Sequence, residues 1–260
     1  MALDPHLFEY LLRLADADLI LAQRLGEAVG KGPVLEEDIA QTNVGLDLLG
    51  QARLWFGYAS DVEARSRGRG RTEDELAFLR DGGEFRNLLL VEQPNGNYAD
   101  TMARQFYFDQ WHLLLLSALE SSADARIREI AAKARKEVSY HAGRSTDWMV
   151  RLGDGTAESH MKMQSALSDL WMYTGEMFEP DALELALIEA GIAADVRTLR
   201  EPWLAAVGMV CREATLEIPE GDWMQGANGR GGKQGVHTEH FGHLLAELQY
   251  LQRAYPGAQW

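Results

Sequence analysis

The sequence predicts an all-α protein, and three observations carry that prediction. Apolar residues recur at steps of three and four along most of the chain, as on one side of a helix. Strict alternation of apolar and polar residues, the mark of a half-buried strand, is almost absent. Two long helical stretches, a long irregular segment and two further helical stretches follow in order, which is the connectivity of a ferritin-like four-helix bundle. We expect a single domain over residues 1–260, with the bundle at about 4–152 and a helical extension at about 153–260.

The first helix is expected to run from Asp4 to Gly30. Asp4 is a suitable N-cap, Pro5 suits the first helical position, and Gly30 is a plausible C-terminal glycine. A second helix should follow the acidic residues 36–38, because the positive end of the helix dipole favours negative charge there. It carries an apolar stripe through Ile39, Leu46, Leu49 and Phe56.

A long crossover is expected over residues 61–97, where glycines, arginines and a Pro-Asn-Gly turn interrupt the helical pattern. One short helix within residues 72–81 fits the sequence TEDELAFLRD. The third and fourth helices should then span about residues 98–120 and 124–152, with only a short turn between them.

The C-terminal extension should contain further helices. One should end near Pro180 and a short one at Gly191, and the sequence at 198–201 has the pattern of a capping box that opens another helix. Residues 217–234 are predicted to be irregular, and a last helix is expected at about 238–255.

Composition excludes several classes of protein. The chain has 40 acidic and 25 basic residues, a net charge of −15, which works against broad contact with nucleic acid. Cys211 is the only cysteine, so no internal disulfide can form, as expected of a protein in the reducing cytoplasm. The N-terminus lacks the pattern of a secretory signal, and no apolar run approaches the roughly 20 residues of a membrane span. We therefore expect a soluble cytoplasmic protein.

Metal chemistry would have to lie in the bundle core. A carboxylate-bridged di-metal site takes one Glu from each of two helices and Glu-x-x-His from each of the other two. The second and fourth predicted helices have no such pair: Val138 stands three residues before His141, and Leu48 stands three before Gln51. Both places look like metal sites from which ligands have been removed.

Four long stretches of the chain resemble the C-subunit family of phenylacetyl-CoA epoxidases. They are NVGLDLLGQAR at 43–53, NLLLVEQPNGNYADTMARQF at 87–106, KEVSYH at 136–141 and GKQGVHTEHFGHLLAELQYLQRAYPG at 232–257. The resemblance extends over essentially the whole chain.

The resemblance implies a degenerate di-iron site. In the related catalytic A subunit, iron is held through the motifs Asp-Glu-Ala-Gly-His and Lys-Glu-Glu-Ser-Phe-His. Here Leu48 replaces the first liganding Glu, Gln51 replaces its His and Val138 replaces the second Glu, so that only His141 is kept. Leu and Val cannot neutralise or bridge two cationic irons. The expected degenerate site consists of Asp18, Leu48, Gln51, Asp109, Val138 and His141.

The same resemblance implies a structural subunit with no catalytic, cofactor-binding or metal-binding residues of its own. The complex would epoxidise phenylacetyl-CoA in aerobic phenylacetate catabolism. Di-iron would sit in the A subunit, and a reductase with flavin and an iron–sulfur cluster would supply electrons from NADPH. Two alternatives stay open: an independently active di-metal oxidase, and a stand-alone ferritin-like scaffold.

Three weaker patterns have competing interpretations. Asp109 and His112 have the i,i+3 spacing of metal ligands, but their neighbours suggest a tightly packed helix. The histidines at 237, 240 and 243 suit a capped helix start or a contact between subunits at least as well as a metal. The loop from Gly226 to Gly235, with Lys233, lacks the spacing of a P-loop; it is either an interface or surface segment or a contact for a coenzyme A phosphate.

Overall fold

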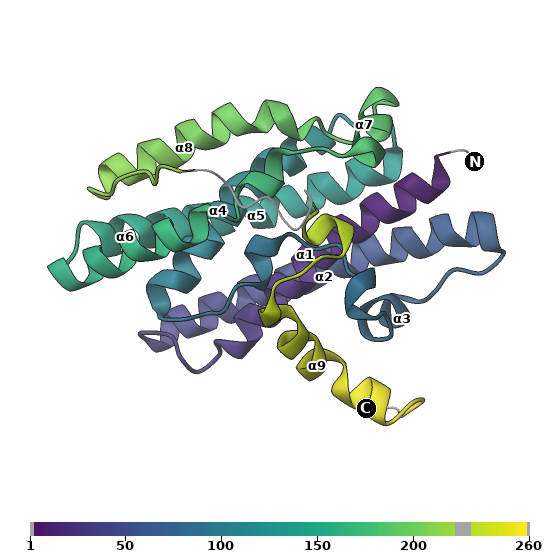
Figure 1. Cartoon of the computed structure of the whole chain (residues 1–260), viewed down its shortest axis with the longest axis horizontal. Helices are drawn as coiled ribbons and strands as arrows, with labels where there is room; N and C mark the ends of the chain where they lie inside the picture. Colours follow the sequence, from purple (N-terminus) through teal and green to yellow (C-terminus); the bar gives the residue numbers. More distant parts are fainter. Residues whose placement is uncertain (1–2, 222–229, 259–260) are drawn as a thin grey trace. The chain divides into compact units, whose positions relative to one another are not determined.

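The computed structural model describes residues 3–221 and 230–258, and all regular structure in these ranges is helical (Figure 1). This confirms the predicted all-α fold class. The α-helices are α1 Asp4–Glu27, α2 Leu35–Arg67, α3 Glu73–Phe78, α4 Tyr98–Leu119, α5 Ala125–Gly153, α6 Ala157–Trp171, α7 Ala182–Glu189, α8 Arg200–Glu213 and α9 Glu239–Ala254. Short 3-10 turns are η1 Gly82–Glu84, η2 Leu89–Glu92, η3 Gly175–Phe178, η4 Val196–Leu199 and η6 Gly232–Gln234.

The chain forms two compact units. The first comprises Met1–Pro94 and Gln225–Trp260, with α1, α2, α3 and α9. The second comprises Asn95–Met224, with α4 to α8. Each unit contains one pair of long helices, α1 with α2 and α4 with α5, and the crossover between the pairs is the one that a ferritin-like chain requires. The expectation of a single domain stays a prediction.

Helix α1 forms the centre of the first unit. Every residue from Tyr10 to Ala22 is buried, and a helix covered on all sides belongs to a core. Leu3 precedes the helix as its N-cap, so the prediction of Asp4 as N-cap was wrong by one residue. The chain leaves the helix after Glu27, and Gly30 follows with a φ of +81°, a conformation that glycine adopts without strain.

Helix α2 differs from its prediction in which face is buried. Phe56 is 2% exposed, but Ile39, Leu46 and Leu49 are 52%, 59% and 38% exposed. The buried face instead carries residues such as Leu48 and Trp55. Apolar residues occupy two sides of this helix, so periodicity revealed a stripe that the chain itself leaves uncovered.

The crossover begins later than predicted because α2 continues to Arg67. Gly68 ends the helix in the left-handed conformation, with a φ of +74°. The predicted short helix is confirmed as α3, and Thr72 caps it in a capping box with Glu75.

Buried ion pairs and hydrogen bonds fasten the crossover to α1. The guanidinium of Arg80 binds the Asp16 carboxylate, and both side chains are at most 1% exposed. Asp16 also accepts the backbone N–H of Arg86 at 2.8 Å. Further along, Arg24 donates to the carbonyl of Glu92 from Nε at 3.0 Å and from Nη2 at 2.6 Å. Two points along the crossover are therefore fixed to the same helix.

The second unit follows its prediction closely in α4 and α5. Asp124 caps α5 by accepting the N–H groups of Arg126 and Ile127 at 2.9 and 3.1 Å. Aromatic packing holds α8 to α4, since Trp203 stacks against Tyr107 at 5.6 Å between ring centroids and donates to its carbonyl at 3.0 Å.

Two predictions for the extension were wrong. Helix α6 ends at Trp171, and the residues before Pro180 form the short turn η3 instead. Thr198 does not open a helix: it lies within η4 and its hydroxyl donates to the Asp195 carbonyl at 2.7 Å. Asp195 is the residue that caps this turn, so the local competition between two caps was decided three residues earlier.

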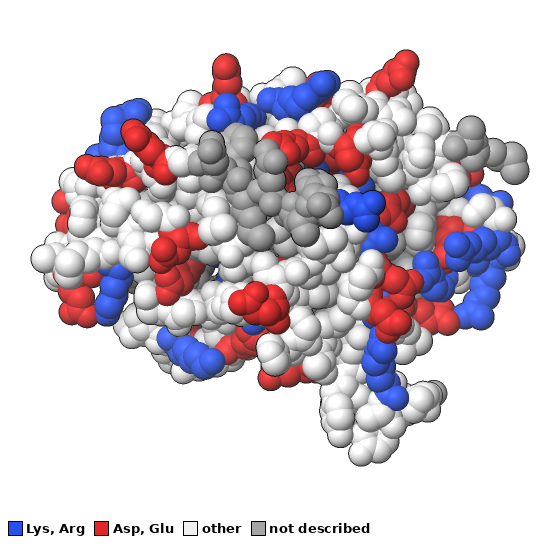
Figure 2. Space-filling model, in the orientation of Figure 1, with Lys and Arg blue, Asp and Glu red and all other residues white. Residues whose placement is uncertain are grey.

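On the face drawn in Figure 2, Lys and Arg side chains lie among Asp and Glu side chains. The run of arginines from residue 65 to 71 is balanced in this way, because Arg67 and Arg71 both pair with Glu63 and Arg69 pairs with Glu75. None of the helices in the described ranges has the length and apolar character needed to cross a membrane.

We expect Asp16→Ala to lower the free energy of unfolding by about 3–5 kcal/mol, because the substitution leaves the Arg80 guanidinium buried without its carboxylate. Urea unfolding followed by circular dichroism measures this change. Glu158→Ala is the control: its pair with Lys162 is exposed, so the loss should stay below about 1 kcal/mol. Equal effects of the two substitutions would show that the Asp16 pair does not anchor the crossover.

Candidate functional site

All six positions of the expected degenerate site are buried in the four long helices. Three belong to the first unit and three to the second. Each side chain is at most 1% exposed: Asp18 on α1, Leu48 and Gln51 on α2, Asp109 on α4, and Val138 and His141 on α5. The sequence thus identified core positions correctly, and their chemistry decides what the core can do.

In the first unit, Leu48 and Gln51 share the buried face of α2 because they are three residues apart. Asp18 is on α1, the helix that pairs with α2. The donors available here are one carboxylate and one neutral amide. Leu48 adds no donor, so this half lacks the carboxylate and imidazole pair of a di-metal half-site.

In the second unit, Asp109 and His141 lie close enough to interact electrostatically. Gln105, one turn before Asp109 on α4, donates from Nε2 to Asp109 Oδ1 at 2.6 Å. On α5, Val138 occupies the position one turn before His141, where a liganding carboxylate would have to stand. One carboxylate and one imidazole remain in this half.

Burial controls the protonation of Asp109. Desolvation raises the pKa of its carboxyl to about 6, although His141, Ser145, Gln105 and Arg144 all act to lower it. The carboxyl is therefore far easier to protonate than an exposed aspartate. A metal ligand has to be ionised, whereas this environment favours the neutral acid.

His112 is a packed core residue, as the alternative to a metal pair with Asp109 predicted. Desolvation lowers the pKa of its imidazole to about 3, and the positive charge of His141 acts in the same direction. The ring packs on Phe108 at 4.9 Å between centroids and lies nearly parallel to Trp111 at 6.3 Å. It stays neutral within an aromatic layer of α4.

These donors do not fit a di-iron pair. Such a site needs bridging carboxylates to hold two cationic metals together, and Leu48 and Val138 stand at two of the carboxylate positions. Within residues 3–221 and 230–258, no group of three or more His, Cys, Asp or Glu side chains is arranged to hold a metal ion. What the chain retains is a set of buried polar groups whose role is packing and hydrogen bonding.

The first unit contains a polar cluster that sequence reasoning missed. The buried Glu92 carboxylate accepts from Asn87 Nδ2 at 2.9 Å, from the Thr238 N–H at 2.6 Å and from His237 Nδ1 at 2.8 Å. His237 also stacks on Phe241, with ring centroids 4.0 Å apart. The cluster joins the crossover to the start of α9, which supports the capped-helix interpretation of His237 over a metal role.

Residues 226–229 of the glycine-rich loop lie outside the described residues. Its described part packs closely: a side chain at Gly232 would meet the Asn87 carbonyl at 1.9 Å, so only glycine fits. Lys233 is 6% exposed. A lysine buried in this way is poorly placed to reach a phosphate in solvent, which favours the structural interpretation of this part of the loop.

Sequence signals for the missed partners are uneven. Gln105 stands four residues before Asp109, so helical spacing alone places it on the same face. Glu92 and Asp16 had no such signal, because their partners are 145 and 64 residues away in the chain.

Comparison with known proteins finds similarity over nearly the full length of the chain. A family model described as "Phenylacetic acid catabolic protein" matches residues 2–260. The C-subunit of 1,2-phenylacetyl-CoA epoxidase from Escherichia coli (strain K12) is 52% identical over 251 residues. That alignment covers 96% of this chain and 98% of the relative.

Asp109→Asn tests whether the core favours a neutral group at this position. The raised pKa means that Asp109 adds stability below about pH 4 and that this contribution is lost as pH rises through about 6. Asparagine cannot ionise, so its free energy of unfolding should rise relative to that of the wild type by on the order of 2–3 kcal/mol between pH 4 and 7. Urea unfolding across this range measures the difference, with Asp61→Asn at an exposed position as control. A difference independent of pH contradicts the assignment.

Proposed function

The chain belongs to the phenylacetic acid catabolic protein family, and from that membership we propose that it is a structural subunit of a 1,2-phenylacetyl-CoA epoxidase. It holds a related catalytic subunit in its active form and carries out no covalent step itself. The relative from Escherichia coli bears the name of such a subunit, which supports the involvement in phenylacetate catabolism.

One observation carries the structural role: the buried positions where a metal-binding bundle has its ligands lack the necessary donors. Leu48 and Val138 occupy places where bridging or liganding carboxylates are required, and neither can bind a metal. The surviving Asp109 is in surroundings that favour its neutral form. A chain built in this way would support its neighbour through packing.

The exposed stripe of α2 supports the existence of that neighbour. Leu35, Ile39, Leu46 and Leu49 are 71%, 52%, 59% and 38% exposed, and steps of four, seven and three residues put them on one side of the helix. An apolar stripe of this length marks a binding surface in a soluble protein. We propose that it is covered by the catalytic subunit, in an interface of the obligate kind.

The rest of the complex follows from the family resemblance. The catalytic subunit would hold the di-iron site that activates dioxygen, and a separate reductase with flavin and an iron–sulfur cluster would supply electrons from NADPH. This chain's own contribution would be to keep the catalytic subunit folded, since binding to a native partner stabilises it by mass action.

The two alternatives find less support. An independently active oxidase needs a complete set of ligands, which the six core positions do not supply. A stand-alone scaffold would expose the α2 stripe to water permanently, which favours aggregation.

Leu46→Glu tests the structural role. The substitution puts a charge at the middle of the α2 stripe, so we expect at least tenfold weaker binding of the catalytic subunit, or about 1.4 kcal/mol or more. Co-expression followed by size-exclusion chromatography measures assembly, and turnover of phenylacetyl-CoA should fall in proportion.

Leu185→Glu is the matched control, because Leu185 is also partly exposed, at 41%, and lies on α7 in the other unit. Circular dichroism should show that both variants fold. An intact, fully active complex with Leu46→Glu would contradict the assignment of the stripe, and turnover by the isolated chain would contradict the structural role itself.

A further inference from the structure

The end of α9 is fastened to the end of α3 through hydrogen bonds that the last turn of α3 would otherwise lack. Gln249 Nε2 donates to the carbonyl of Arg80 at 3.0 Å. Arg253 Nη2 donates to the same carbonyl at 2.8 Å and to that of Leu79 at 3.2 Å. Carbonyls at a helix C-terminus need such donors, and a cation there is also favoured by the helix dipole. The two helices are thus held in a fixed arrangement within the first unit.

This arrangement presents apolar side chains to solvent. Leu79, Tyr250, Leu251 and Tyr255 are 53%, 63%, 47% and 58% exposed. In Figure 2 the C-terminal end of α9, at the lower right of the view, is mostly white, with few charged atoms. Large apolar residues gathered on rigid, hydrogen-bonded elements are typical of a binding surface.

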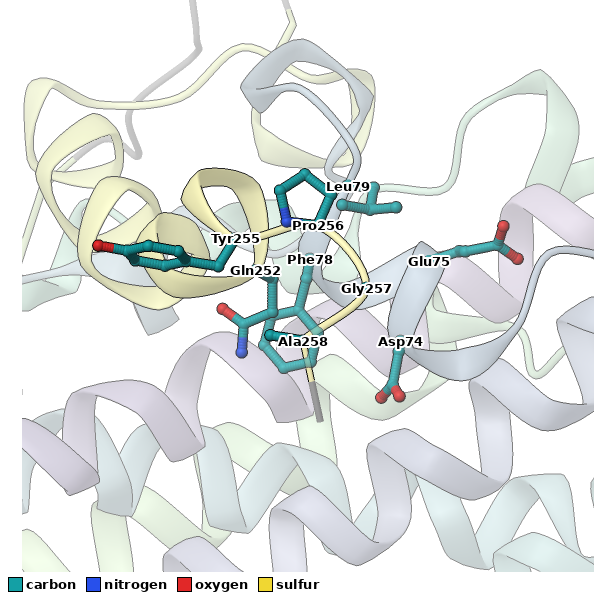
Figure 3. Close-up of a pocket in the computed structure, with 9 residues that line it drawn as sticks. All are labelled: Asp74, Glu75, Phe78, Leu79, Gln252, Tyr255, Pro256, Gly257 and Ala258. Carbon is teal, nitrogen blue, oxygen red and sulfur yellow. The ribbon is translucent and has the colours of Figure 1, made fainter. Parts of the chain in front are cut away.

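A cavity of about 410 Å³ opens between the two elements (Figure 3). Figure 3 shows Asp74 and Glu75 of α3 across from Gln252 and Tyr255 of the C-terminal segment. Phe78 is one of the apolar residues of the lining. The volume is in the range of cavities that take a large side chain or a small ligand. A second hollow, of about 510 Å³, follows α9 past Tyr250.

Charge indicates what fits the cavity. Glu75 is already paired with Arg69 at 2.6 Å, but among the residues that the structure describes, Asp74 forms no ion pair. The chain as a whole carries a net charge of −15. A ligand with a cationic group would therefore be attracted to this wall, and its apolar part would pack on Phe78 and Leu79.

The exposed surface is too extended for a small molecule. Tyr250 and Leu251 continue it along α9 beyond the cavity, whose lining includes neither of them. A second copy of this chain also fits poorly, because its run of basic residues is already paired with Glu63 and Glu75 and two copies with this net charge repel one another.

We propose that this surface, formed by Leu79, Tyr250, Leu251, Tyr255 and the cavity beside Asp74, binds a segment of a second protein component of the epoxidase. That segment puts one large apolar side chain into the cavity and a Lys or Arg against Asp74. The inference rests on the proposed function, since it requires a multicomponent complex. It concerns a component other than the one that covers α2, because the two surfaces use different elements of the first unit.

Leu79→Glu, produced by co-expression with the catalytic and other epoxidase subunits, tests the proposal. We expect the purified complex to lose one component and to keep the component that Leu46→Glu removes, with binding of the lost component weakened at least tenfold. Asp74→Asn should weaken binding less and reduce its dependence on salt. Glu247→Gln, at an exposed position of α9 outside the cavity lining, is the matched control and should change neither.

Size-exclusion chromatography with light scattering gives the composition of each complex. A folded Leu79→Glu variant that keeps every component overturns this inference and leaves the proposed function standing. Self-association of the isolated chain that Leu79→Glu abolishes would also overturn it, because the surface would then bind a second copy. If the wild-type chain binds no other component, both the inference and the proposed function fail.

Discussion

The pairing of the buried Asp16 carboxylate is the constraint on which the first unit depends. A charge at the centre of α1 is tolerable only if the chain brings donors to it, and Arg80 and the backbone of Arg86 are those donors. Fixing them fixes the crossover. The crossover then carries Glu92 into the core, where Glu92 binds the start of α9. The position of the C-terminal helix therefore follows from one buried charge on the first helix.

The second unit meets the same constraint in a different way. At Asp109 the cost of burial outweighs the attraction of His141 and Arg144, so the carboxyl moves toward the neutral form and shares a hydrogen bond with Gln105. In a metal-binding bundle the ions themselves would balance such charges. Here Leu48 and Val138 reduce the number of carboxylates that need balancing, and the core is stable through packing. A degenerate site and a structural role are thus two consequences of the same substitutions.

The sequence predicted the long helices and the buried site positions because their signals are local. Caps such as Thr72 and Asp124 and the spacing of Leu48 and Gln51 can be read within one or two turns. It did not predict which side of α2 is covered, because Ile39 and Leu46 are as apolar as the residues that α1 buries. Nor could it pair Glu92 with His237, 145 residues away. Such contacts depend on tertiary structure, and periodicity contains no information about them.

Metal content of the isolated chain is the most direct test of the central claim, that this fold has kept its bundle and lost its metal chemistry. The chain should be purified alone after expression in iron-rich medium, and its iron should be measured by elemental analysis beside that of the assembled complex. The account predicts no stoichiometric iron in the isolated chain and about two irons for each catalytic subunit in the complex. Two irons bound to the isolated chain would contradict the account and would make this protein an oxidase in its own right.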